Sequence, residues 1–132
     1  MTTNLTSVNL ENSTAVTPPS SDNSTAVATT AWSLLGFAIS LGTNGYIKFP
    51  AWLSGFMLQW GTAGGLADNS PTTVAFNTNF PNAAFAVVAN DNGPNATSGN
   101  PRTMGCTITS TSDFTIEASG SGASAFWFAV GH

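Results

Sequence analysis

From residue 42 onward, short apolar runs alternate with clusters of turn-forming residues. The turn clusters are rich in Gly, Asn, Pro and Ser and cover 43–45, 61–70, 77–82, 91–101, 110–112 and 120–122. Between them we expect strands over 46–49, 56–60, 72–76, 84–90, 104–108, 114–116 and 125–132. Met104, Cys106 and Ile108 alternate with small residues, which is typical of a strand with one buried face. About seven short strands predict an all-β fold, a small antiparallel β-sandwich or a partly closed barrel.

Two segments of different composition precede the strands. Residues 1–21 are rich in Thr, Ser and Asn, so we expect an extended N-terminal arm. Residues 22–41 begin with a possible capping residue and continue with an alanine-rich stretch, which predicts one short helix. Its apolar positions recur about every seven residues and are Val27, Ala31, Leu34, Ala38 and Leu41. Two heptads are too few for a coiled coil alone, but the stripe would line an axis between chains held together elsewhere. The strands then form a third segment, 42–132.

The large aromatic residues provide the candidate core. By alternation we assign to it Phe49, Phe56, Trp60, Phe76, Phe85, Phe114 and Phe128. Trp127 lies between Phe126 and Phe128, so one face of the last strand needs a cover, which a subunit interface would supply. Trp52 falls in the connection between the first two strands. It is either a ring that stacks on a sugar or a staple within an interface between subunits.

Composition narrows the classes of partner. Only 6% of the residues are charged, against about 25% in an average soluble domain, so Asn, Ser and Thr do most of the solvating. The net charge is −4, and two basic residues, Lys48 and Arg102, cannot neutralise a stripe of phosphates, which argues against nucleic acid. No apolar run reaches membrane-spanning length, so we expect no membrane insertion. The single Cys106 excludes an intrachain disulfide framework and is read as a small buried residue.

The carboxylates and the histidine do not have the spacing or the position that catalysis requires. Asp113 and Glu117 share a strand face about 13 Å apart, whereas a glycosidase needs two carboxyl groups about 5–9.5 Å apart. The sole His132 is the last residue, where we expect an imidazole to be poorly held. Three copies of His132 on one axis would be needed for a metal site. We therefore predict no catalytic residue, no cofactor and no metal, and a protein that is not an enzyme.

Recognition is expected in the polar loop that follows the fourth predicted strand. Loops on a rigid β scaffold commonly carry binding residues. The candidates here are Asn90, Asp91, Asn92, Asn95, Asn100 and Arg102, together with Trp52. Arg102 either forms charge-assisted bonds to phosphate or acidic sugars, or pairs with Asp91 across the base of the loop.

Three motifs carry a resemblance to a known family. They are Asn44-Gly-Tyr-Ile-Lys-Phe-Pro50, Gln59-Trp-Gly61 and the closing Ala125-Phe-Trp-Phe-Ala-Val-Gly-His132. Together they resemble the C-terminal tip domain on tail fibres of tailed bacteriophages. Residues 22–32 are similar to a repeat of fibre shafts, so the resemblance covers 22–32 and 43–132. The chain departs from the pattern in a longer connection, 51–55, and in ending on His132, where the family more often has Tyr.

The resemblance implies a homotrimeric tip domain on a virion tail fibre. Its knob would bind a host surface glycan such as lipopolysaccharide, or an outer-membrane protein, and its arm would dock to other tail or baseplate proteins. The trimer interface would include the stripe of 22–41 and Trp127. Two alternatives stay open: a structural fibre or baseplate attachment module without receptor binding, and a free oligomeric lectin.

Overall fold

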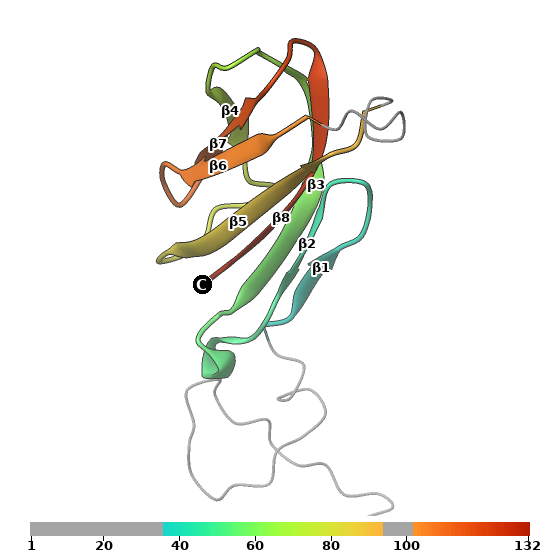
Figure 1. Cartoon of the computed structure of the whole chain (residues 1–132). Helices are drawn as coiled ribbons and strands as arrows, with labels where there is room; N and C mark the ends of the chain where they lie inside the picture. Colours follow the sequence, from blue (N-terminus) through green and yellow to red (C-terminus); the bar gives the residue numbers. More distant parts are fainter. Residues whose placement is uncertain (1–35, 94–101) are drawn as a thin grey trace, which may run out of the picture.

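The computed structural model of the protein describes residues 36–93 and 102–132 (Figure 1). These residues form eight strands and one 3-10 turn: β1 Ala38–Ser40, β2 Gly45–Lys48, η1 Ala51–Leu53, β3 Met57–Leu66, β4 Thr72–Ala75, β5 Ala84–Asp91, β6 Met104–Ile108, β7 Asp113–Ala118 and β8 Ala123–Gly131. In this part of the chain no helix is long and apolar enough to cross a membrane.

The strands form two antiparallel sheets that pack face to face. The larger sheet has the order β1-β2-β3-β8-β5, and the smaller has the order β4-β7-β6. In Figure 1 the smaller sheet lies across the upper half of the larger one. The expected all-β, antiparallel sandwich is confirmed.

The core fills the space between the two sheets. Phe76 is its centre, with ring centroids 4.9 Å from Phe80, 5.0 Å from Phe114 and 6.0 Å from Trp127. Alternate residues of β8 point into this space, and those that flank Trp127 are small. Small residues on one sheet opposite large rings on the other allow the sheets to interdigitate. The remaining buried apolar residues are Met57, Leu66, Ile116, Ala118, Ala123, Ala125 and Ala129.

The predicted aromatic core is only partly right. Phe76 and Phe114 are buried as expected, but Phe56, Phe85 and Phe128 are exposed, and Phe49 and Trp60 are half-buried. Strand alternation shows which residues share a face, but the packing of the second sheet decides which face becomes the interior. On β8 that choice buries Trp127, at 4% exposure, and turns Phe126 and Phe128 outward.

The predicted helix over 22–41 is wrong at its C-terminal end. Ala38–Ser40 is strand β1, which pairs with β2 through Ala38↔Lys48 and Ser40↔Tyr46. The edge of β2 offers backbone groups that pairing satisfies. The turn before β1 depends on Gly36, which has a φ of +89° and lies against Pro50. The first described strand therefore lies within the predicted helical segment, and 22–35 lie outside the described residues.

Strand β3 is held in place by contacts of three consecutive residues, Gln59, Trp60 and Gly61. The buried Gln59 amide donates to Thr78 O at 2.7 Å and accepts from Thr78 N at 3.1 Å. The Trp60 indole N–H donates to Gly42 O at 3.0 Å, and its ring lies over Gly45. A Cβ on Gly61 would meet the Trp127 ring at 2.6 Å, so only glycine fits there. The three residues thus fix β3 on both of its faces.

Candidate functional site

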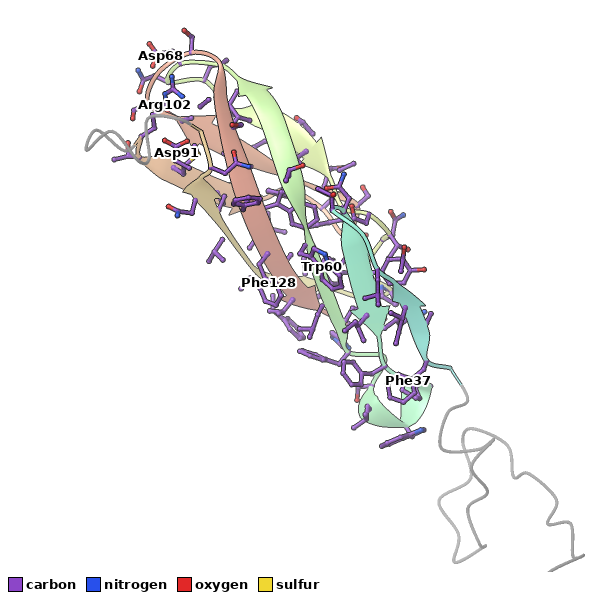
Figure 2. All side chains as sticks on the ribbon, turned by 90° about the vertical axis from the view of Figure 1, so that its right-hand side faces the viewer. Phe37, Trp60, Asp68, Asp91, Arg102 and Phe128 are labelled. Atoms are coloured by element: carbon purple, nitrogen blue, oxygen red, sulfur yellow. The ribbon has the colours of Figure 1, made fainter. Side chains whose placement is uncertain are left out.

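The described domain is elongated, and its two ends carry different residues (Figure 2). Phe37 lies at one end, and Asp68, Asp91 and Arg102 lie at the other. At the Phe37 end the ring of Phe49 is 5.3 Å from Phe37 and 5.9 Å from Phe56. We call the end with Asp68, Asp91 and Arg102 the distal end, because the described chain starts at the opposite one.

The residues predicted to bind a receptor do not all come together, because Trp52 lies apart from the others that the structure describes. Trp52 lies in η1, in the connection between β2 and β3, and is 45% exposed. That connection folds back as a turn, with Leu53 N donating to Pro50 O at 2.9 Å. Because Pro50 contacts Gly36, η1 belongs to the Phe37 end. Trp52 is therefore separated along the length of the domain from Asp91 and Arg102.

Asp91 is a clamp at the base of the distal loop. It is the last residue of β5 and only 4% exposed. Its carboxylate accepts from Gly93 N at 2.9 Å and from Arg102 N at 3.2 Å. The backbone N–H groups of Gly93 and then Arg102, with a smaller contribution from the Arg102 charge, hold the pKa of Asp91 below its ordinary value. Asp91 thus joins the two ends of the loop and does not project as a contact residue.

Arg102 faces the turn between β7 and β8. Its guanidinium donates to Ser121 O at 3.3 Å, while its backbone N–H makes the bond to Asp91. The same turn is held by Asp68, whose carboxylate accepts from Gly120 N at 2.6 Å. The pairing between Arg102 and Asp91 across the loop base therefore runs through the backbone.

The asparagine candidates of the loop lie in different surroundings. Asn90 is exposed on β5, opposite Phe126 of β8. Asn92 is half-buried, and its backbone N–H donates to Ser124 O at 3.0 Å. Asn95 and Asn100 lie outside the described residues.

Within residues 36–93 and 102–132 nothing covers the outer, largely apolar face of the larger sheet. Register places along it the rows Ile39–Ile47–Leu58–Val130–Ala86, Gly45–Trp60–Phe128–Val88 and Thr62–Phe126–Asn90. We call these residues the apolar face. None of them is charged, and Val88 and Phe126 are 62% and 60% exposed. From the sequence we expected Trp127 on the face that needs a cover, whereas the structure places Trp127 in the chain's own core and its two neighbours on this face.

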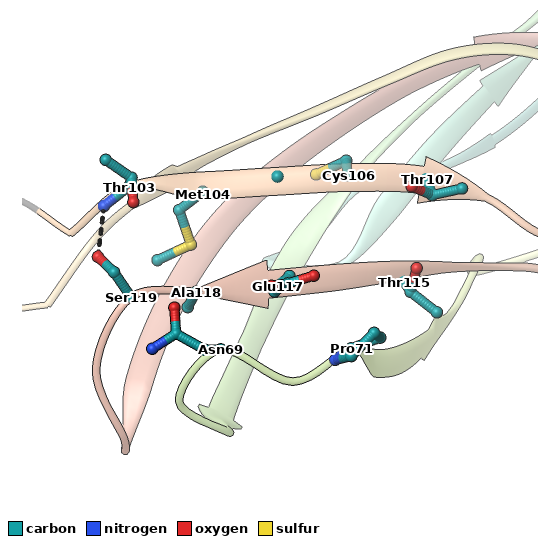
Figure 3. A pocket seen from close by; sticks show the side chains of 11 residues that line it. Asn69, Pro71, Thr103, Met104, Cys106, Thr107, Thr115, Glu117, Ala118 and Ser119 are labelled. Atoms are coloured by element: carbon teal, nitrogen blue, oxygen red, sulfur yellow. Dashed lines mark hydrogen bonds between the residues drawn. The ribbon is translucent and has the colours of Figure 1, made fainter.

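The outer face of the smaller sheet is polar. There Thr115 pairs with Thr73 and Thr107, and Glu117 pairs with Gly105. A groove of about 350 Å³ runs along this face (Figure 3). The groove was not predicted from the sequence. The signal for it was that Thr103, Gly105 and Thr107 alternate with Met104 and Cys106, which places the first three on one face of the strand.

The two carboxylates of β7 have different surroundings. Asp113 accepts hydrogen bonds from the hydroxyls of Thr109 and Ser112, with Ser110 close by, and these bonds hold the pKa of Asp113 below its ordinary value. It thereby orders the turn between β6 and β7. Glu117 is exposed and lines the groove.

His132 is better held than the sequence suggested. Its ring stacks on Phe85 with centroids 4.9 Å apart and an interplanar angle of 26°. Its backbone N–H donates to Ala83 O at 2.9 Å, and its carbonyl accepts from Asn82 N and Ala83 N. The expectation of a loose terminal imidazole is therefore wrong.

The fold has close counterparts among solved structures. The N-truncated R2-type pyocin tail fiber matches with a TM-score of 0.64 and 18% identity, covering 100% of this chain and 54% of that one. A C-terminal portion of the R2 pyocin fiber of P. aeruginosa matches with 0.64 and 18%, covering 100% and 37%. The N-truncated R1-type pyocin tail fiber matches with 0.59 and 20%, covering 80% and 98%.

These matches at low identity show a shared fold. The chain spans about half the length of the N-truncated R2-type fiber that it matches. No curated protein matches the sequence. The family described as putative tail fiber protein gp53-like, C-terminal, matches residues 48–132, which is more than half of the 132 residues. The chain therefore belongs to this family of C-terminal tail fibre domains.

Proposed function

We propose that this chain is the receptor-binding tip of a phage tail fibre, a homotrimer on the virion tail that adsorbs to a glycan of the host surface. The observation that carries the proposal is the contrast between the two outer faces of the sandwich. One is the uncharged apolar face, and the other is lined by threonines and a carboxylate. Covering the first face removes apolar surface from water and therefore stabilises an assembly, whereas the second face is suited to remain in water.

In the proposed assembly, other copies of the same chain cover the apolar face. Most soluble homo-oligomers are closed and symmetric, so in the proposed trimer each copy would turn the same face toward the shared axis. Phe126, Phe128 and Val88 take the interface role that sequence analysis gave to Trp127. Leu41, which is 78% exposed, directly follows β1 and would extend the interface at the edge of the sheet. Ala38 pairs with Lys48, so it lies on the other face of the sheet from Ile39 and does not belong to the apolar face. Val27, Ala31 and Leu34 stay predictions for the segment before it.

The distal loop is the proposed receptor contact. Asn90, Asn92 and Arg102 flank it, and Asn95 and Asn100 lie within it. The Asp91 clamp holds its two ends, which lowers the entropy that binding would cost. Three such loops on one trimer would gain affinity through multivalency. The receptor would be a surface glycan such as lipopolysaccharide, or a loop of an outer-membrane protein.

A structural attachment module is the second candidate function. The observation in its favour is the Phe37 end, where Trp52, Leu53 and Phe56 are exposed beside a groove of about 530 Å³ lined by Phe49 and His132. Apolar residues there would dock another tail or baseplate protein, with the N-terminal arm alongside. The position of Trp52 favours a role in contacting another subunit or tail protein at the Phe37 end over a role in stacking on a sugar.

The oligomer is tested by placing one charge on each outer face. Val88→Asp puts a carboxylate on the apolar face, and Thr73→Asp puts the same group on the polar face as a matched control. Both positions are exposed in the single chain, so both variants should fold. Light scattering should give a trimer for the wild type and Thr73→Asp, and a monomer for Val88→Asp. A wild-type monomer, or a Val88→Asp trimer, would contradict the proposed assembly.

Receptor binding is tested by adsorption of the full chain to a panel of bacterial strains. The receptor-binding function predicts saturable adsorption to some strains. The attachment module predicts none, with binding to virion proteins instead.

A further inference from the structure

The groove on the smaller sheet is open, polar and formed by regular strands. Its lining comes from β6, β7 and the segment before β4, and it holds about 350 Å³. Figure 3 shows Thr103, Thr107, Thr115 and Glu117 along the two strands, with Asn69 and Pro71 at one side. Because the strands are paired over their full length through Met104↔Ala118 and Ile108↔Phe114, the floor of the groove is rigid.

Gly105 forms the bare centre of this floor. It pairs with Glu117, and a Cβ built on it would meet no other heavy atom within 4 Å. A glycine inside a strand weakens it, and often marks a place where another molecule approaches the backbone. Among the residues that the structure describes, no packing contact requires glycine here, in contrast to Gly61 and Gly131, which have rings against them.

The polar groups around Gly105 are hydroxyl, amide and carboxylate, and Met104, Cys106 and Ala118 complete the lining. The hydroxyls of Thr103, Thr107 and Thr115 can donate and accept, and the Glu117 carboxylate accepts. Asn69 is exposed and donates its side-chain amide N–H to Asp68 at 2.7 Å, and its side-chain oxygen can act as an acceptor. Thr103 N is held by Ser119 Oγ at 3.0 Å, so the rim is ordered before a ligand arrives.

The charge of the lining selects among saccharides. Among the described residues that line the groove, Glu117 is the charged one, and none is basic. A carboxylate repels phosphate and uronate groups, and it accepts hydrogen bonds from sugar hydroxyls. The groove also lies on the side of the sandwich opposite the apolar face, so covering that face leaves it accessible.

From this arrangement we infer that the groove around Gly105 binds a sugar unit of a neutral, hydroxyl-rich polysaccharide, with Glu117 accepting from its hydroxyls. This inference rests on the proposed function and adds a site on the smaller sheet, where Thr103 lies next to Arg102 at the base of the distal loop. It also assigns the class of sugar, since the groove disfavours the phosphorylated or acidic sugars that Arg102 would suit.

The test fills the groove without disturbing the fold. In Gly105→Val the new side chain occupies open space on a strand that favours β-branched residues. The matched control is Gly64→Val on β3, where a Cβ also meets nothing within 4 Å. The full chain and both variants are measured for adsorption to a strain panel. Competition then uses two probes from an adsorbing strain: its neutral O-polysaccharide and its phosphorylated core oligosaccharide.

The inference predicts that Gly105→Val lowers adsorption by roughly tenfold or more, while Gly64→Val does not. The expected loss is large because the proposed trimer carries several copies of the groove, and the loss of affinity at each copy multiplies. Neutral polysaccharide should compete, and Glu117→Gln should weaken that competition. Three outcomes would overturn the inference and leave receptor binding in place. They are equal adsorption by both glycine variants, competition by the phosphorylated oligosaccharide alone, and adsorption only to strains with acidic surface glycans. A wild type that adsorbs to no strain would overturn the proposed function itself.

Discussion

Trp60 on β3 and Phe128 on β8 are register partners, and both rings lie on the outer face of the five-stranded sheet (Figure 2). Trp60 is immobilised by its bond to Gly42 O and by Gly45 beneath its ring. Phe128 is 43% exposed. Trp60 therefore gives this surface a stiff ring, which loses little side-chain entropy when another molecule covers it.

The double variant Phe126→Ser with Phe128→Ser separates folding from assembly. Both side chains are exposed in the single chain, so the free energy of unfolding of the monomer should change by less than about 1 kcal/mol. The wild type, stabilised by association, should unfold at a urea concentration that rises with protein concentration. The double variant should lose that dependence. A wild type whose midpoint is independent of concentration would contradict the role of the apolar face.

Gly131→Ala should destabilise the fold strongly. A Cβ there would lie 2.3 Å from Ala83 O and 2.5 Å from the Phe80 ring, so β8 or the Phe80 segment must move. Overpacking of this kind costs about 1–3 kcal/mol, measured as a shift of the urea midpoint. Gly64→Ala is the control, because its Cβ meets open space. Equal midpoints for the two variants would contradict the close packing at Gly131.

The sequence predicted the sandwich because its strand signals are local. The alternation over 104–108 coincides with β6, and the runs at 72–76 and 84–90 lie within a residue or two of β4 and β5. Residues 61–66 were read as loop because of Gly61, Gly64 and Gly65, yet they continue β3. Gly61 is required there by the Trp127 ring, a contact between distant strands that local patterns do not contain.

The functional faces were harder to predict than the strands. Alternation separated Trp127 from Phe126 and Phe128 correctly, but burial of either face satisfies the same pattern. The motif Gln59-Trp60-Gly61 identified the family because each residue is needed for packing, and it therefore says little about ligands. Gly105 and Glu117, which line the polar groove, belong to no motif. Their pairing is visible only once the register of β6 and β7 is known.

Gln59→Met tests the buried amide of that motif. Gln59 is fully buried and makes two bonds to the backbone of Thr78, so a thioether would leave that N–H and carbonyl without partners. Unsatisfied buried groups cost about 1–3 kcal/mol each, and we expect a loss of about 2 kcal/mol or more in urea unfolding. Leu58→Met on the opposite face of β3 should change stability by less than about 1.5 kcal/mol. A neutral Gln59→Met would show that Thr78 finds other partners.

Asp91→Asn should make the stability of the domain less dependent on acid. The folded pKa of Asp91 is lowered by the N–H groups of Gly93 and Arg102, so the ionised clamp stabilises the fold above the unfolded pKa of about 3.9. That stabilisation is lost as the pH falls through the lower folded pKa. Thermal unfolding should therefore show a higher unfolding temperature for the wild type than for the variant at pH 7, and this difference should narrow steadily below about pH 4.

Asp113→Asn, at the β6–β7 turn, is the comparison variant. Its difference from the wild type should narrow in the same way, because hydroxyl donors lower the pKa of Asp113. Only Asp91→Asn should also increase proteolysis in the distal loop, because only Asp91 ties the two ends of that loop together. Asp91→Asn with an unchanged gap from pH 7 to pH 2, or with an intact loop, would show that the carboxylate is not the clamp.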